Sequence, residues 1–154
     1  MTRTASAGVA ATACCAAVWM VMSVSPVGQT AARSISATQS HSVQGGVYTE
    51  TQAKRGMDVY DQECVTCHGP NLTGGESGPA LVGNDFIANW SDKTVGDLFE
   101  RTRIDMPKDS PGRLSRQQYA DVIAYVLSAN KYPVGDSELE HDTATLQKIP
   151  WIAR

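Results

Sequence analysis

A chain of 154 residues with 13 basic and 16 acidic side chains has room for one compact domain and carries a slight negative charge. This balance excludes the strongly basic class of nucleic-acid-binding domains, and no block of like charges forms a charged tail.

Residues 1 to 32 are predicted to be a secretory signal. They carry one charge, Arg3, ahead of a long apolar run, and small residues at Thr30 and Ala32 place the cleavage site near Ala32. The uncharged stretch after Arg3 also exceeds the roughly 20 residues that span a bilayer, so an uncleaved membrane anchor is an alternative. Under both interpretations the folded part is periplasmic or otherwise extracytoplasmic.

Residues 33 to 48 are predicted to form a flexible leader, because Ser, Thr, Ala and Gln dominate them and no apolar periodicity is present. His41 lies in this leader and is expected to be exposed to solvent. The folded domain is expected to span residues 49 to 130. Thr49 should cap its first helix, and Gln52, three residues later, completes the capping-box pattern.

The first helix runs into Cys64, and apolar residues at helical spacing predict its buried face at Ala53, Met57 and Tyr60. Gly56 lies among them. Because glycine inside a helix costs about 1 kcal/mol relative to alanine, its presence indicates that another helix approaches closely.

Residues 68 to 93 are rich in Gly, Pro, Asn and Asp and are predicted to be mostly loop, with a turn or two of helix at residues 86 to 90. A loop of this length in a small domain usually wraps around something. Thr94 should cap a second helix that ends around Arg103, and Met106 follows in a loop.

The last predicted helix begins at Ser115, which forms a capping box with Gln118, and it ends at Asn130. Residues 131 to 154 are expected to lie on the surface of the domain or to trail from it, with Trp151 pinned to the body. No strand is predicted. The fold class is therefore all-α, with three to four short helices and long loops, and its small apolar surface needs a large buried cofactor to complete the core.

The four cysteines form two pairs with different interpretations. Cys14 and Cys15 lie inside the apolar run, where a thiol behaves as a small hydrophobe, and we assign them no function. Cys64 and Cys67 are the two cysteines of the segment Cys-Val-Thr-Cys-His, residues 64 to 68. This segment, which ends at His68, is the signature of covalent haem attachment. Two thiols at this spacing reach the two vinyl groups at one porphyrin edge, and the next residue is an imidazole that can bind the iron.

Three other interpretations of this segment are weaker. A thioredoxin-like redox pair has the same cysteine spacing but belongs at a helix start within an alternating β/α pattern, which the sequence lacks. A structural zinc site needs four ligands, and only the remote His41 or His141 could complete it. A disulfide between Cys64 and Cys67 leaves His68 and the small core unexplained.

Met106 is the best candidate for a second iron ligand. It follows the attachment segment by enough chain to cross to the other haem face, and Pro107 restricts its backbone. Met57 is at a helical position, where core packing is the usual role of methionine, and His141 lies in a polar stretch that favours exposure. A thioether ligand raises the reduction potential relative to two histidines.

Two further groups could tune the iron. The segment Gly78-Pro79-Ala80-Leu81 could place a carbonyl against the free ring nitrogen of His68 and a leucine against the porphyrin. The indole N–H of Trp90 could meet a haem propionate, although simple packing explains this residue equally well.

Taken together, these residues resemble a class I c-type cytochrome over roughly residues 49 to 130. That family carries a glycine and an aromatic residue on its first helix, here Gly56 and Tyr60, and an aromatic residue on the last helix that crosses it, here Tyr125. Three segments, residues 60–64, 94–101 and 119–130, are more narrowly similar to bacterial cytochrome domains that accompany quinoprotein alcohol dehydrogenases, although no dehydrogenase domain is attached here.

The resemblance implies one covalent haem c whose iron is bound by His68 and Met106. It also implies that the Pro79 carbonyl orients His68. The expected function is single-electron transfer between redox protein partners, with a dehydrogenase, such as a quinoprotein dehydrogenase, as donor and an oxidase or membrane complex as acceptor. The chain is then not an enzyme but an electron carrier, or the electron-transfer subunit of a dehydrogenase or oxidase complex. It meets a membrane only if the amino-terminal segment is uncleaved. The alternative is a haem enzyme or a gas or redox sensor whose sixth iron position is open or displaceable.

Overall fold

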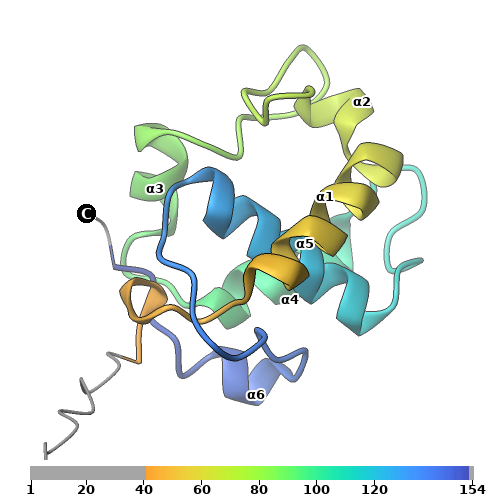
Figure 1. Ribbon diagram of the computed structural model, residues 1–154. Helices are drawn as coiled ribbons and strands as arrows, with labels where there is room; N and C mark the ends of the chain where they lie inside the picture. Colours follow the sequence, from red (N-terminus) through yellow and green to blue (C-terminus); the bar gives the residue numbers. More distant parts are fainter. Residues whose placement is uncertain (1–40, 153–154) are drawn as a thin grey trace, which may run out of the picture. The chain divides into compact units, whose positions relative to one another are not determined.

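The computed structural model describes residues 41 to 152, and Figure 1 shows a helical body in this part of the chain. Six α-helices and a short 3-10 helix make up its regular structure, apart from an isolated bridge between Thr94 and Pro150. The all-α prediction is confirmed. In chain order the elements are η1 (Val43–Gly45), α1 (Glu50–Glu63), α2 (Val65–His68), α3 (Asn84–Trp90), α4 (Val95–Asp105), α5 (Arg116–Ala129) and α6 (Thr143–Leu146).

The predicted signal or anchor at residues 1 to 32, with Cys14 and Cys15, lies outside the described residues, as do residues 33 to 40 of the predicted leader. Between residues 41 and 152, no helix is long and apolar enough to cross a membrane.

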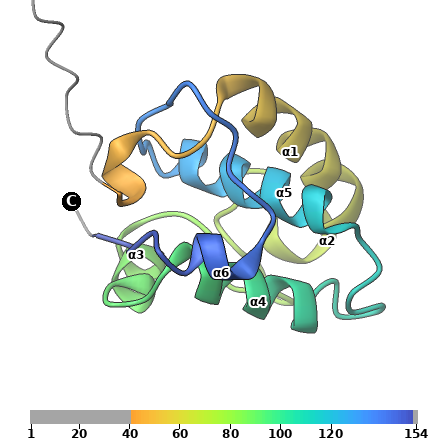
Figure 2. The same ribbon diagram turned by 90° about the horizontal axis from the view of Figure 1, so that it is seen from below.

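Helices α1 and α5 cross, as Figures 1 and 2 show from two directions, and Gly56 lies at their contact. A Cβ atom at this position would lie 1.8 Å from the backbone oxygen of Asp121, so no other residue fits without separating the helices. Beyond the crossing, the rings of Tyr60 and Tyr125 meet with their centroids 5.4 Å apart. The close approach predicted from Gly56 is confirmed, and it places the end of α1 that precedes Cys64 against α5.

The helix caps follow the sequence closely. Thr94 and Ser115 each form a capping box with the residue three positions later, and Thr49 accepts a hydrogen bond from the backbone N–H of Gln52. The second half of the capping box predicted at Thr49 is wrong. The Gln52 side chain is fully buried and instead exchanges two hydrogen bonds with the backbone of Leu139, at 2.9 and 2.6 Å. An amide side chain has both donor and acceptor atoms, so one buried backbone residue can pair with its nitrogen and its oxygen together.

Met57 does not belong to the buried face of α1, contrary to the prediction. Its side chain is 40% exposed, whereas the buried residues of this helix include Ala53, Gly56 and Tyr60. Successive residues turn by about 100° around a helix. The crossing at Gly56 therefore centres the buried stripe on one side of Met57 and leaves that residue at its edge.

The leader predicted to extend to residue 48 is also wrong over its last seven residues. Val43 and Tyr48 are buried, and the Tyr48 hydroxyl donates a 2.7 Å hydrogen bond to the backbone oxygen of Tyr132. Gly46 lies so close to Gly135 that no side chain fits between the two backbones. Two isolated apolar residues show no periodicity, and they are buried only because a distant segment covers them.

That segment is residues 131 to 152, which packs against the helices. Its buried side chains include Leu139, Leu146 and Trp151, and the Trp151 ring makes edge contacts with Phe86 and Tyr132 at centroid distances of 5.7 and 5.4 Å. These contacts extend the apolar core beyond α1, α4 and α5. The core is therefore larger than three or four helices would provide.

Candidate functional site

The attachment cysteines lie on one helical turn that continues from α1. Cys64 ends α1, its N–H bonding to the Tyr60 oxygen at 2.9 Å, and the N–H of His68 bonds to the Cys64 oxygen at 3.0 Å. Cys64 and Cys67 are three residues apart on this turn, so their side chains lie on the same face. Both are half-buried free thiols. The spacing thus presents two sulfur atoms side by side, as the haem interpretation requires.

Burial sets the state of the first thiol. It raises the pKa of Cys64 to about 11, with a further contribution from the carboxylate of Glu63, while Arg113 acts in the opposite direction. The thiolate is the form that binds metals and attacks disulfides, so a raised pKa disfavours both roles for Cys64 at neutral pH. Within residues 41 to 152 no cluster of three or more His, Cys, Asp or Glu side chains could hold a metal ion. The zinc interpretation therefore finds no ligand set in this part of the chain.

His68 is held by the loop that follows it. Its ring is buried, and Nδ1 lies 2.8 Å from the carbonyl oxygen of Pro79. Because a carbonyl only accepts hydrogen bonds, Nδ1 must carry a proton, and Nε2 is the ring nitrogen left available to bind a metal. Gly78 permits this approach, since a Cβ there would lie 2.9 Å from the Cys67 oxygen and 3.2 Å from Cε1 of His68. The arrangement fixes the tautomer and ring orientation that an iron ligand needs.

Asn130 fixes the far end of the same loop, a role that its neighbours in the sequence do not indicate. Its Nδ2 donates to the oxygens of Leu81 and Val126 at 2.8 and 2.9 Å, and its Oδ1 accepts from the N–H of Gly83 at 3.1 Å. The side chain is buried and all of its polar atoms are used. The sequence signals only that Asn130 ends α5, and indeed it is the C-cap of that helix.

Tyr60 secures the near end of the loop. Its hydroxyl donates a 2.6 Å hydrogen bond to the backbone oxygen of Gly69, and burial raises the pKa of this phenol to about 12. The hydroxyl therefore remains a donor throughout the physiological range. The loop between His68 and Gly83 is held at both ends and in the middle.

Met106 lies at the C-cap of α4 with an extended backbone, at φ −127° and ψ 152°, as the residue before a proline prefers. Its carbonyl oxygen accepts hydrogen bonds from the hydroxyl of Tyr119 at 2.7 Å and from the N–H of Gly112 at 3.3 Å. Tyr119 is buried on α5. Its position on the apolar face of that helix gave no sign that its hydroxyl would hold the backbone of Met106.

The remaining predicted site residues lie at the margin of the core. Leu81 and Trp90 are half-buried and pack against the main hydrophobic cluster. The Trp90 ring lies 6.2 Å from that of Phe86, which supports its packing role. His41 and His141 are both exposed.

The residues present fit a covalently bound haem. The two free thiols share one face of a turn, the neighbouring imidazole has one nitrogen engaged and the other available, and a thioether stands on a separately anchored loop. Haem ligation by histidine and methionine uses this set of donors.

Comparison with known proteins assigns the family. The family model described as "Cytochrome C oxidase, cbb3-type, subunit III" matches residues 51–126. The chain is 35% identical over 86 residues to cytochrome c-551 of Bacillus subtilis, covering 56% of this chain and 70% of that protein. It is 34% identical over 74 residues to the cytochrome bc1 complex cytochrome c subunit of Corynebacterium diphtheriae, covering 47% of this chain and 26% of that subunit.

Among solved structures, the crystal structure of the sulfane dehydrogenase SoxCD from Paracoccus pantotrophus aligns with a TM-score of 0.49 and 21% identity. The alignment covers 64% of this chain and 52% of that chain. Because the chain matches most of cytochrome c-551 and carries the haem attachment segment within the matched region, it belongs to the cytochrome c family, as an electron-transfer protein of the class I type with covalently bound haem c.

Proposed function

We propose that this chain is an exported monohaem electron carrier in which His68 and Met106 are the two axial ligands of the iron. The observation that carries this proposal is the 2.8 Å hydrogen bond between Nδ1 of His68 and the Pro79 carbonyl. It leaves Nε2 as the free ring nitrogen of the residue that follows Cys67 in the sequence. A histidine oriented in this way is prepared to bind a metal before the metal arrives.

The protein residues have separate tasks in this carrier. Cys64 and Cys67 would hold the porphyrin through thioether bonds, and the Pro79 carbonyl keeps the His68 ring from turning and increases its basicity. Tyr119 holds the backbone from which the Met106 side chain projects. Bound haem c supplies a one-electron redox centre, and ligation by Met106 would set its potential above that of a centre with two histidines.

Mass analysis of the mature product, made in a host that attaches haem, tests the foundation of the proposal. The expected result is one porphyrin per chain on a peptide that contains Cys64 and Cys67, with a new amino terminus near Ala32. A product without added porphyrin would contradict the assignment. A haem-bearing product that begins at Met1 would instead identify residues 1 to 32 as a retained anchor.

Met106→Ala tests the sixth ligand. We expect the reduction potential to fall by on the order of 100 mV, since axial ligands set haem potentials over about 0.8 V, and the reduced protein to bind carbon monoxide readily. The wild-type protein should bind little. Met57→Ala is the matched control, because Met57 is exposed on α1. An unchanged potential and spectrum in Met106→Ala would show that another residue is the ligand, or that the position is open as in a sensor or haem enzyme.

Two features support redox complexes as the partners. The matched family model is named for a subunit of a cytochrome c oxidase, and one relative is named as a subunit of the cytochrome bc1 complex. We propose that the chain receives electrons from an exported dehydrogenase, such as a quinoprotein, and delivers them to an oxidase or membrane complex. Docking of this kind buries less than about 1,200 Å².

Stopped-flow reduction by a purified quinoprotein dehydrogenase would measure electron transfer from the proposed donor to this chain. A rate no faster than that with an unrelated flavoprotein would contradict the proposed donor.

A further inference from the structure

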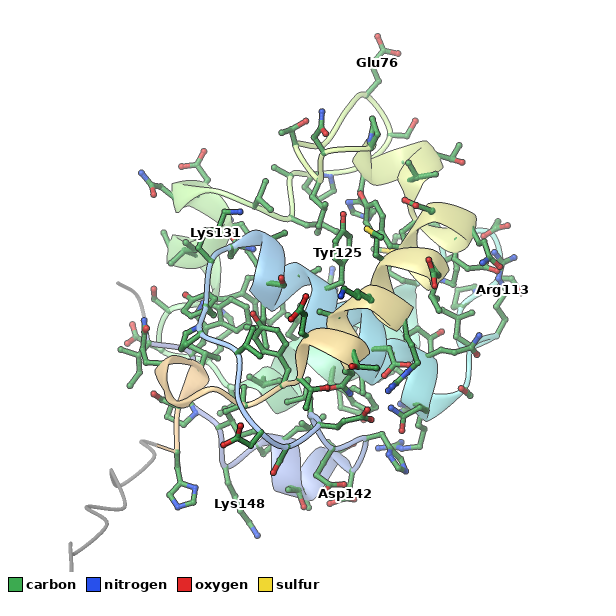
Figure 3. All side chains as sticks on the ribbon, in the orientation of Figure 1. Glu76, Arg113, Tyr125, Lys131, Asp142 and Lys148 are labelled. Carbon is green, nitrogen blue, oxygen red and sulfur yellow. The ribbon has the colours of Figure 1, made fainter. Side chains whose placement is uncertain are left out.

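An ion pair joins the end of α1 to the loop that carries Met106. Arg113, in the loop before α5, pairs through Nη2 with the carboxylate of Glu63, the residue immediately before Cys64. The partners are 50 positions apart in the sequence, and both side chains are partly exposed, at 37% and 24%. Figure 3 shows Arg113 at the edge of the molecule beside the end of α1.

Hydrogen bonds within and beside the loop connect Arg113 to the backbone of Met106. The N–H of Gly112, directly before Arg113, donates to the Met106 carbonyl at 3.3 Å, and the Tyr119 hydroxyl donates to the same oxygen at 2.7 Å. Nη1 of Arg113 also lies 3.4 Å from the carboxylate of Asp109 within the loop. Arg113 thus joins Asp109 in the middle of this turn to Glu63 beside the attachment segment, and its neighbour Gly112 bonds to the Met106 backbone.

Some other ion pairs of the described residues also join separate elements, such as Arg55 with Asp121 and Glu138, whereas two pairs close to this loop lie within one helix. Arg101 pairs with Asp105, and Arg103 with Glu100, inside α4. Such pairs support the helix that contains both partners. The pair formed by Glu63 and Arg113 supports no single element, and its geometric effect is to hold the Met106 loop against the residue that precedes Cys64.

We propose that Glu63 and Arg113 are positioning residues for Met106, acting as a charged latch that keeps the loop of residues 106–115 seated and slows release of the methionine from the iron. The inference rests on the proposed role of Met106 as sixth ligand. Arg113 also acts electrostatically on Cys64, with the sign opposite to that of Glu63. Removing either partner should therefore have the same effect on the release of the methionine, whereas the two removals should have opposite electrostatic effects on the haem.

This difference lets one experiment separate a mechanical role of the ion pair from a purely electrostatic one. Glu63→Gln and Arg113→Gln are made separately in the haem-bearing protein, and two quantities are measured: the reduction potential, and the rate at which saturating imidazole replaces the methionine in the oxidised protein. Both variants should exchange about two- to five-fold faster than wild type, the range expected for a surface ion pair. The potential should rise in Glu63→Gln and fall in Arg113→Gln, because one loses a negative charge and the other a positive charge near the haem.

Two controls complete the design. Arg101→Gln removes an exposed arginine whose partner lies within α4, and it should leave the exchange rate unchanged. The double variant Glu63→Arg with Arg113→Glu restores a pair of opposite charges and should return the rate toward the wild-type value.

Exchange rates that change in opposite directions, following the potentials, would overturn the latch and leave only a charge effect. Unchanged rates in both single variants would overturn it as well. Failure of the ligand assignment is distinguishable, since Met106→Ala would then leave the spectrum and potential unchanged, whereas failure of the latch alone leaves the large effect of Met106→Ala intact.

Discussion

The two loops that carry the proposed iron ligands are held by different kinds of contact. The loop after His68 is fixed by neutral hydrogen bonds, most of them to backbone atoms, and Asn130 and Tyr60 anchor it from buried positions. The loop after Met106 is held by the hydroxyl of the buried Tyr119, by the N–H of Gly112 within the loop, and by a partly exposed ion pair. Buried neutral bonds are insensitive to ionic strength, whereas exposed charges are screened. We therefore expect the methionine side to open first and the histidine side to fail only when the domain unfolds.

The largest effect should come from Asn130→Ala. This change leaves the Leu81 oxygen and the Gly83 N–H without their partner, and a buried polar group that loses its hydrogen bond costs about 1–3 kcal/mol. We expect the free energy of unfolding to fall by about 2 kcal/mol in guanidinium titration. Exchange of Met106 for imidazole should keep its rate.

Asn84→Ala is the control for this variant, because Asn84 is exposed at the start of α3. A stability loss in Asn130→Ala no greater than in the control would contradict the buried-anchor interpretation of the histidine side. Faster methionine exchange in Asn130→Ala would show that the two loops are not independent.

Tyr119→Phe should have an intermediate effect and act on the other loop. The Met106 carbonyl keeps its longer bond from Gly112, so the loss should be about 1 kcal/mol, with exchange faster by about five-fold, the factor that this energy corresponds to. Tyr48→Phe removes a buried hydroxyl that donates to a backbone oxygen at the same 2.7 Å. It should lose similar stability and leave exchange unchanged. Equal exchange rates in the two variants would contradict the role given to Tyr119.

Salt should have the smallest effect. Raising the ionic strength from about 0.01 to 1 M shortens the Debye length from about 30 to 3 Å, which weakens the pair of Glu63 and Arg113. Methionine exchange in the wild-type protein should accelerate by no more than about three-fold, and in Arg113→Gln it should not respond. Equal salt dependence in the two proteins would mean that screening acts elsewhere.

The sequence was most informative where the structure is local. Periodicity and capping residues predicted the long helices. The glycine at position 56 predicted the crossing of α1 and α5, because glycine destabilises a helix and the close approach of another helix is the usual reason for its presence there. The one-turn helices α2 and α6 were not predicted, since four residues are too few for a periodic signal. The attachment segment was readable because its chemistry depends on spacing alone.

Contacts between distant segments were not readable. Gln52 matched a capping box, yet its buried amide bonds to Leu139, 87 positions away. The same holds for Asn130, whose neighbours in sequence say nothing of Leu81. Val43 and Tyr48 became part of the core only through residues that follow α5. Predicting each of these contacts requires knowing which distant segments pack against one another, and a single sequence does not give that information.

The ends of the described chain meet on the side of the molecule away from the attachment turn. Val43 bonds to the Pro150 oxygen and Gln44 to the Ile152 oxygen, both at 3.3 Å, and in Figures 1 and 2 this junction lies across the body from α2. A membrane tether that joined the domain at residue 41 would therefore attach on the side opposite the attachment turn. Such a tether would leave the cysteine-bearing end free to face an electron donor or acceptor.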